Sequence, residues 1–334
     1  MPGGWPRLAA HRATRTVIRL PCLSKLNRTT HTAFYIRLTP SIIMYNRSGG
    51  RVGQLDGKVA MITGAGGMKG IGRACALKLA AQGADIVISD FKRDPRDLPP
   101  QEIKANWRSL DSVAEEIEAL GRRCLKLWCD LTVSAQIEET ARRAAEHFGH
   151  IDILVNNARA IIGRDRAAIT DLNEEVWQHF LRINTTAPFL MIKYVSRSMI
   201  AQARGGRVIN IASDASKRAK PKTAAYTTSK FAVLGLTQAA ALDLAPHRIT
   251  VNAVCPGSVN TDRLNYWEAD QAQAQGMSLE DFRAKIVRDA GKSVPLGRIA
   301  EPEDVANLVA FLASDEASFI TAQSYNVNGG TVAH

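Results

Sequence analysis

Short apolar runs alternate with longer stretches of helical periodicity from Gln54 onward. This alternation is typical of repeated βαβ units, in which each helix returns the chain to start the next parallel strand. The pattern predicts one doubly wound α/β domain with a seven-stranded parallel sheet. We expect its strands at residues 59–63, 85–89, 123–129, 151–155, 207–211, 250–254 and 324–327. The charged, proline-rich segment 92–100 predicts a loop after the second strand.

The positive charge of the chain is concentrated at its start. Residues 1–50 hold eight Arg or Lys and no Asp or Glu, so the rest of the chain carries +3 of the net charge of +11. We therefore expect a disordered basic leader over residues 1–50, a catalytic domain over residues 51–334, and no nucleic-acid partner. The leader resembles a transit peptide, or translation begins at Met44. The two interpretations predict a mitochondrial matrix protein, if residues 1–43 are a transit peptide, or a cytoplasmic one.

Hydropathy and cysteine content exclude two further classes of protein. No run of eighteen apolar residues appears, so we expect no membrane span. The five cysteines are odd in number and form neither a Cys-x-x-Cys pair nor a cluster with metal-ligand spacing. We therefore predict reduced thiols and no metal site.

A glycine-rich stretch, Thr63–Gly72, lies between the first predicted strand and a helical pattern over 73–80. Glycines in this position permit a tight turn and a close approach of the backbone to a pyrophosphate, while the helix N-terminus supplies aligned N–H groups. The segment therefore predicts a dinucleotide site.

Asp90 ends the second predicted strand, where a carboxylate accepts hydrogen bonds from the adenosine ribose. It would repel a 2′-phosphate, which favours NAD over NADP. Lys69, Lys92 and Arg93 lie nearby and leave NADP open, since cations in these places can hold a phosphate.

Tyr226 and Lys230 stand four residues apart in a segment with helical character, so the two side chains share one face. An ammonium next to a phenol favours the phenolate, which turns Tyr226 into a usable acid or base. Alone, this pair is common on solvated helix faces; its weight comes from Ser213, thirteen residues upstream, and from the glycine-rich stretch.

With these motifs together, the chain from about Leu55 to Gly330 resembles the short-chain dehydrogenase/reductases, whose fold is a Rossmann-type domain. The resemblance implies a catalytic tetrad of Asn184, Ser213, Tyr226 and Lys230. It also implies a set of cofactor-binding residues, which comprises Gly64, Gly66, Gly70, Ile71, Gly72, Asp90, Asp130, Leu131, Asn157, Ala158, Pro256, Gly257, Val259 and Thr261 together with Tyr226 and Lys230.

Two departures from the family pattern stand out. The glycine loop is two residues longer than usual, which leaves open which residues of 65–69 wrap the phosphates. Arg159 replaces the glycine expected after Asn156-Asn157-Ala158. If that position needs a left-handed backbone, arginine costs about 1 kcal/mol or more; otherwise the turn has another shape.

The resemblance implies hydride transfer between NAD, or alternatively NADP, and a secondary alcohol or ketone. Tyr226 would act as the general acid/base, Ser213 would hydrogen-bond the substrate oxygen, Lys230 would lower the proton affinity of the phenol, and Asn184 would hold a water. Segment 260–294 would cover the substrate, with Tyr266, Trp267, Met277 and Phe282 as an apolar wall. The cationic Arg159 and Arg164 would suit a polar or anionic substrate, although exposed loop arginines usually have no such role.

Two other functions remain open. One is an NADPH-dependent carbonyl or 3-oxoacyl reductase, and the other is an NAD-binding sensor without catalysis. The apolar faces of the helical segments 185–204 and 223–244 imply, by analogy with the family, a homotetramer or, second, a dimer.

Overall fold

The structure is a computed structural model that describes residues 34–38, 41–45, 53–94, 98–161, 165–262 and 268–334. The chain divides into two units, Met1–Arg51 and Val52–His334. In the first, β1 (Phe34–Leu38) and β2 (Ser41–Tyr45) pair antiparallel. The expected disorder of the leader stays a prediction for its other residues, which lie outside the described part of the chain.

All seven strands of the second unit form one parallel sheet, in the order β5-β4-β3-β6-β7-β8-β9. The predicted fold class is confirmed, and the predicted strand ends are within two residues of the observed ones. The strands are β3 (Val59–Thr63), β4 (Asp85–Asp90), β5 (Cys124–Trp128), β6 (Ile153–Asn156), β7 (Gly206–Ile211), β8 (Ile249–Pro256) and β9 (Ser324–Val327).

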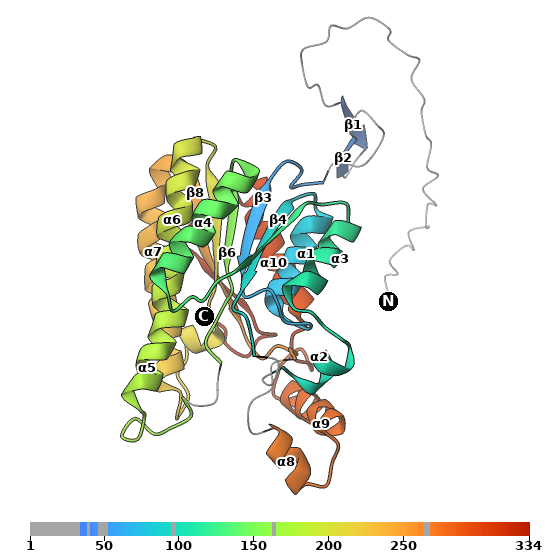
Figure 1. Cartoon of the computed structure of the whole chain (residues 1–334), viewed down its shortest axis with the longest axis vertical. Helices are drawn as coiled ribbons and strands as arrows, with labels where there is room; N and C mark the ends of the chain where they lie inside the picture. The colour runs from blue at the N-terminus through green and yellow to red at the C-terminus, as the bar shows by residue number, and fades with distance from the viewer. Residues whose placement is uncertain (1–33, 39–40, 46–52, 95–97, 162–164, 263–267) are drawn as a thin grey trace, which may run out of the picture. The chain divides into compact units, whose positions relative to one another are not determined.

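Helices cover both faces of the sheet (Figure 1). One face carries α1 (Ile71–Ala81), α3 (Leu110–Ala119) and α10 (Pro302–Ala313), and the other carries α4 (Ser134–Phe148), α6 (Ala187–Gln202) and α7 (Ala224–Leu244). The remaining α-helices are α2 (Pro100–Lys104), α5 (Glu174–Leu181), α8 (Glu268–Ala274) and α9 (Leu279–Lys292). Of the helices described, none is both long and apolar enough to cross a membrane.

Strand β3 shows how the sheet divides the core. Ala60 and Ile62 are buried in the cluster with α1, α3 and α10, whereas Val59 and Met61 are buried in the cluster with α4, α6 and α7. Successive side chains of a strand point to opposite faces, so a strand covered on both faces is apolar at every position. This explains why β3, which is buried at all five positions, appears in the sequence as an almost continuous apolar run.

The sheet reverses its strand order at β3. Strand β3 pairs with β4 on one side and with β6 on the other, so the connections that leave β3 and β6 diverge from each other. Ligands of doubly wound sheets bind at this reversal, beyond the carboxyl ends of the strands. The glycine loop after β3 and Asn157-Ala158 after β6 lie at this point.

Between β4 and α3, the predicted loop 92–100 is irregular over residues 92–94 and 98–99, while Pro100 is already the first residue of α2. Residues 95–97 lie outside the described part of the chain.

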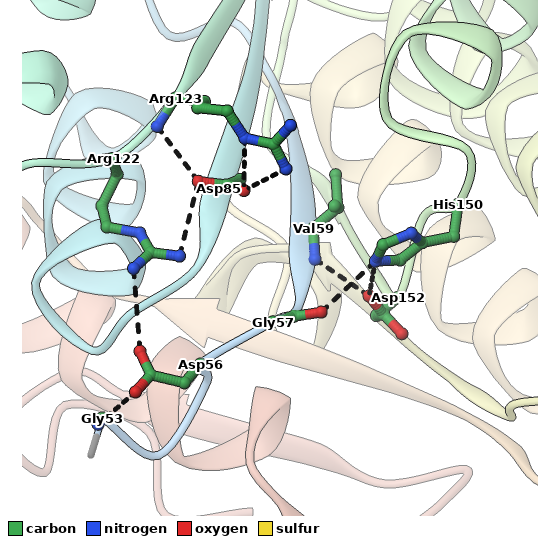
Figure 2. A network of polar contacts seen from close by, with 9 residues as sticks. All are labelled: Gly53, Asp56, Gly57, Val59, Asp85, Arg122, Arg123, His150 and Asp152. Atoms are coloured by element: carbon green, nitrogen blue, oxygen red, sulfur yellow. Dashed lines mark hydrogen bonds and ion pairs between the residues drawn. The ribbon is translucent and has the colours of Figure 1, made fainter. Parts of the chain in front are cut away.

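At the opposite edge, the amino ends of the strands are joined by a polar network (Figure 2). Asp85, the first residue of β4, accepts hydrogen bonds from the backbone N–H of Arg123 at 3.0 Å and from its Nε at 2.9 Å. Asp152, just before β6, accepts one from the N–H of Val59 at 2.9 Å. The two carboxylates thus hold the starts of β3, β4 and β5, because they satisfy buried N–H groups that the sheet ladder leaves unpaired.

The surroundings of Asp85 set its charge state. Burial alone would raise its pKa, but the hydrogen bonds from Arg123 and the positive charges of Arg122 and Arg123 outweigh burial and hold the pKa below its usual value. A lowered carboxylate pKa means that the folded state favours the ionised form. The resulting stabilisation is present at neutral pH and is lost as the pH falls through the folded-state pKa.

We predict that Asp85→Asn lowers the free energy of unfolding by about 1.5–3 kcal/mol at pH 7, since it removes a buried acceptor of charged hydrogen bonds. This loss in the free energy of unfolding should become smaller as the pH is lowered. Urea titrations at pH 7 and at about pH 3, below the ordinary pKa of an aspartate, measure both effects. Asp111→Asn is the control: Asp111 pairs with Lys126 at 2.6 Å in solvent, so it should change stability by less than about 1 kcal/mol. Equal effects of the two substitutions would contradict the structural role of Asp85.

Candidate active site

Two adjoining cavities lie beyond the carboxyl ends of the strands. The larger has a volume of about 1380 Å³ and is lined by the glycine loop, by Ser213, Tyr226 and Lys230, and by α9. The smaller, of about 460 Å³, is lined by Asp90 and by the segment that follows β5. Gly64 and Arg159 line both cavities.

Most of the predicted cofactor residues line one of the two cavities. The larger is lined by Gly64, Gly70, Ile71, Asn157, Tyr226, Lys230, Pro256, Gly257, Val259 and Thr261. The smaller is lined by Gly64, Asp90, Asp130, Leu131 and Ala158. Gly66 and Gly72 line neither of them, and both are buried.

The glycines act through close packing. Gly64 has a φ of +69°, and a Cβ on it would lie 2.7 Å from the Cα of Ala158. A Cβ on Gly72 would lie 2.4 Å from the carbonyl oxygen of Gly64 and 2.6 Å from Nδ2 of Asn157. Only glycine therefore lets α1 begin so close to the ends of β3 and β6, which is the cradle that a dinucleotide requires.

The backbone of the long glycine loop is largely hydrogen-bonded within the protein. The N–H groups of Gly66, Met68 and Lys69 donate to carboxylates of Asp90 (2.7 Å), Glu102 (3.2 Å) and Asp262 (2.6 Å), and that of Ala65 donates to the carbonyl of Ser89 (3.2 Å). These bonds reduce the number of N–H groups in residues 65–69 that could bind a phosphate. Within 65–69, Gly67 alone has an N–H that takes part in none of these hydrogen bonds, and α1 begins shortly after it, at Ile71.

Asn157 and Thr63 tie the two halves of the sheet together. The Asn157 side chain donates to the carbonyl oxygens of Thr63 and Gly64, both at 2.9 Å, and the Thr63 hydroxyl accepts from the N–H groups of Asn157 and Ala158, both at 3.1 Å. Asn157 therefore fixes the shape of the glycine loop, because both hydrogens of its side-chain Nδ2 group are donated to that loop.

Asp90 is buried, and two of the three cations that the sequence analysis named, Arg93 and Lys69, are in ion pairs, while Lys92 is exposed. The two carboxylate oxygens of Asp90 accept hydrogen bonds from Gly66 and Phe91, which orient the group at the wall of the smaller cavity. Arg93 pairs with Glu102 at 2.9 Å, and Lys69 pairs with Glu301 at 3.1 Å.

Ser213 combines two roles. Its hydroxyl accepts from the N–H of Ala215 at 3.1 Å and so caps the short helix Asp214–Ser216, and it donates to Asp214 at 3.2 Å. Ser213 also lines the larger cavity together with Tyr226 and Lys230. The capping hydrogen bond therefore orients the Ser213 hydroxyl, while Ser213 still lines the cavity.

Lys230 is buried one helical turn after Tyr226 on α7. Its side chain is 3% exposed, and Nζ donates to the carbonyl oxygen of Ile211 at 2.8 Å. Burial, and after it the charge of Arg159, lower the pKa of Lys230 to about 7, because both disfavour the ammonium form. Lys230 can therefore exchange a proton near neutral pH.

Asn184 lies behind the cavity wall, in the π-helical turn Arg182–Thr186 that precedes α6. Its Oδ1 accepts from the N–H of Ala160 at 2.8 Å, and its Nδ2 donates to the Ser229 hydroxyl at 3.0 Å. The side chain thus connects the segment after β6 to the neighbour of Lys230. Single π turns are frequent at functional sites.

The φ angle of Arg159 is not positive, so its backbone is not left-handed. The turn after β6 has another shape, and arginine carries no backbone strain. Arg164, Tyr266 and Trp267 lie outside the described residues. Met277 is half-buried, and Phe282, on α9, is 4% exposed and so belongs to the core of the substrate segment.

Three residues that the sequence analysis did not identify hold the glycine loop: Glu102, Asp262 and Trp107, whose Nε1 donates to the carbonyl of Gly66 at 2.8 Å. No local pattern marks them. No group of three or more metal-ligating side chains occurs among the described residues, and Cys75, Cys124, Cys129 and Cys255 are free thiols there.

Comparison with known proteins agrees with this geometry. A family model described as enoyl-(acyl carrier protein) reductase matches residues 64–332. The chain is 39% identical over 277 residues to a galactitol 2-dehydrogenase of Agrobacterium fabrum, which covers 83% of this chain and 98% of that one. This chain belongs to the short-chain dehydrogenase/reductases.

Solved structures of short-chain dehydrogenases share the fold. The carveol dehydrogenase of Mycobacterium avium in complex with NAD has a TM-score of 0.72 and 30% identity, over 84% of this chain and 99% of that chain. An NAD⁺-bound xylitol dehydrogenase has a TM-score of 0.69 and 34% identity, over 83% and 99%. Together these relatives show that this short-chain dehydrogenase is a nicotinamide-dependent alcohol dehydrogenase or ketone reductase that acts on a small molecule.

We predict opposite outcomes for two glycines of this short-chain dehydrogenase. Gly72→Ala should lower the free energy of unfolding by about 1–3 kcal/mol, since its Cβ meets backbone at 2.4 Å. Gly70→Ala has no neighbour nearer than 3.5 Å, so it should leave stability unchanged and weaken NAD binding, because the added methyl lies where the backbone must approach a phosphate. Thermal unfolding and calorimetric NAD titration measure the two effects. Normal NAD affinity in a folded Gly70→Ala protein would contradict the position of the pyrophosphate.

Proposed function

We propose that this short-chain dehydrogenase oxidises a secondary alcohol with NAD⁺ and uses Tyr226 as general acid/base, with reduction of the ketone as the reverse reaction. The observation that carries the proposal is the larger cavity, which is lined both by Tyr226, Lys230 and Ser213 and by the glycine loop. Proton-transfer groups and a dinucleotide cradle thus share one space.

Tyr226, Lys230 and Ser213 each have a separate role in the reaction. When bound, the nicotinamide supplies the hydride chemistry. Tyr226 takes the hydroxyl proton of the substrate, and Lys230 stabilises the phenolate by its charge. On substrate binding, Ser213 turns its single O–H from Asp214 to the substrate oxygen and stabilises the charge that develops there.

Asn184 acts on this site by positioning neighbouring segments of the chain. Because its side chain is bonded to Ala160 and Ser229, it holds the turn after β6 against α7 and fixes the place of Lys230. A water that relays the proton from Lys230 would then be held by backbone of the π turn rather than by the Asn184 amide.

The choice of NAD over NADP rests on local charge. Asp90 presents a carboxylate to the smaller cavity, while two of the three cations that could hold a 2′-phosphate, Arg93 and Lys69, are paired with Glu102 and Glu301. A 2′-phosphate would meet the repulsion of Asp90, with the exposed Lys92 as the third cation.

Replacing Tyr226 with Phe tests the general acid/base. We expect kcat to fall by about 10²–10⁴-fold with galactitol or butane-2,3-diol as substrate, and the Kd for NAD⁺ to stay within about threefold. Reduced-nicotinamide absorbance and calorimetry measure the two quantities. Phe319→Tyr, at an exposed side chain outside α6 and α7, is a control that should leave both unchanged. A Tyr226→Phe protein with near-normal rate would overturn the proposal and favour the non-catalytic NAD-binding sensor.

Replacing Asp90 with Ser tests the cofactor preference. The NAD⁺/NADP⁺ ratio of kcat/KM should fall by about 10- to 100-fold, the equivalent of one charged hydrogen bond. Adding Glu102→Gln, which frees Arg93 but can still accept from Met68, should lower the ratio further. An unchanged ratio in both variants, or faster turnover of a 3-oxoacyl thioester with NADPH in the wild-type protein, would favour the carbonyl or 3-oxoacyl reductase.

We further propose a homotetramer, with a dimer second, in the cytoplasm. The support for assembly is the exposed apolar side chains of α6 and α7, which include Phe189, Phe231 and Leu242. Light scattering gives the mass of the particle, and a monomer would contradict this. If residues 1–43 are a transit peptide, the compartment is the mitochondrial matrix, which fractionation of cells expressing the full chain would show.

A further inference from the structure

The glycine loop and the start of segment 260–294 are joined by two sets of contacts at Lys69. The N–H of Lys69 donates to Oδ2 of Asp262 at 2.6 Å, and the N–H of Asp262 donates back to the carbonyl oxygen of Lys69 at 3.2 Å. The Lys69 ammonium pairs with Glu301 at 3.1 Å, and Glu301 accepts a hydrogen bond from the side chain of Asn260 at 2.9 Å. The loop residue Lys69 therefore contacts segment 260–294 both directly and through Glu301.

The Asp262 carboxylate is the stronger of these two connections. Asp262 is 4% exposed, so its short charged hydrogen bond with the N–H of Lys69 is shielded from water. The ion pair between Lys69 and Glu301 has both side chains nearly half exposed, and such pairs contribute little. The connection between the loop and the segment therefore depends mainly on Asp262.

Helix α2 joins the same two segments a second time. Nε2 of Gln101 donates to the carbonyl oxygen of Asp262 at 2.9 Å, while the neighbouring Glu102 accepts from the N–H of Met68 at 3.2 Å. Two adjacent residues of α2 thus hold the segment and the loop. The place of Asp262 relative to the glycine loop is fixed from both sides.

From Asp262 the contacts continue to α8 and α9. Arg283, on α9, donates to the carbonyl oxygen of Thr261 at 3.2 Å and pairs with Glu268, the first residue of α8, at 3.0 Å. Both Arg283 and Glu268 line the larger cavity, which also contains the catalytic residues. A shift of Asp262 therefore reaches the two helices that border this cavity.

These contacts connect two places where ligands bind. Lys69 directly precedes Gly70, the N-cap of α1, where we expect the pyrophosphate. Val259 and Thr261, which we expect to contact the nicotinamide, directly precede Asp262 or lie close to it in the chain. A ligand that holds one end of these contacts lowers the cost of ordering the other end, so two ligands favour each other's binding.

We propose that Asp262 is a positioning residue of this dehydrogenase: it transmits cofactor binding at the glycine loop to α8 and α9 and so raises the affinity of the cavity for the alcohol. This inference rests on the proposed function, because it assigns a role within the same site.

Hydrogen exchange tests this connection without turnover. NADH should slow the exchange of the α9 backbone amides by about fivefold or more in the wild-type protein, and should change it by less than about twofold in Asp262→Ala. Asp262→Asn, whose amide oxygen can still accept from Lys69, should keep part of the protection. Asp289→Ala is the matched control: Asp289, also on α9, pairs with Lys292 at 2.7 Å in solvent, so its loss should leave the effect of NADH unchanged.

Kinetics and calorimetry separate positioning from mere support of the loop. In Asp262→Ala, the KM for butane-2,3-diol should rise by about tenfold, while the Kd for NAD⁺ stays within about threefold. A tenfold gain in NAD⁺ affinity with unchanged protection of α9 would show that the carboxylate competes with the pyrophosphate, and would overturn the proposal. A loss of NAD⁺ affinity and of thermal stability with an unchanged KM would assign Asp262 to loop support alone, and would overturn it as well.

The Tyr226→Phe protein separates this proposal from the proposed function. If NADH protects α9 in Tyr226→Phe as it does in the wild type, the role of Asp262 stands even where the role of Tyr226 is wrong. If NADH does not protect α9 in the wild type, but butane-2,3-diol is oxidised in a Tyr226-dependent reaction, the role of Asp262 is wrong and the alcohol dehydrogenase stands.

Discussion

The hydrogen bonds from the Asn157 side chain to the carbonyl oxygens of Thr63 and Gly64 hold the two strands between which the sheet reverses its order. Parallel strands on either side of this reversal send their connections in opposite directions, and the gap that results is where a ligand can enter. The close approach of Gly72 to Gly64 and Asn157 depends on the same contacts. Both cavities adjoin this point, so the site exists only while β3 and β6 are held together.

Local patterns made much of this architecture predictable. Apolar runs located the strands most plainly where both faces are covered, as in β3, which is buried at every position. Tyr226 and Lys230 could be paired because a helix fixes which residues share a face. Asp90 was predictable for a similar reason: the carboxyl end of a strand points toward the ligand edge.

The remaining part of the site depends on contacts that no local pattern encodes. Glu102 bonds the N–H of a residue 34 positions earlier, and Asp262 bonds one that is 193 positions away. Neither carboxylate has a special neighbour in the sequence. Their role appears only when α2 and the segment after β8 are placed next to the glycine loop, which is decided by packing rather than by periodicity.

The two added residues of the glycine loop explain why those carboxylates are present. A longer loop exposes additional N–H groups, and a buried donor without a partner is costly. Glu102 and Asp262 satisfy the N–H groups of Met68 and Lys69, so these donors are withdrawn from phosphate binding. Gly67 and the N-terminus of α1 are then the donors that we expect to meet a pyrophosphate, since the helix dipole there favours an anion. The bond between Asp262 and the N–H of Lys69 also ties the glycine loop to the start of segment 260–294, which we expect to cover the substrate.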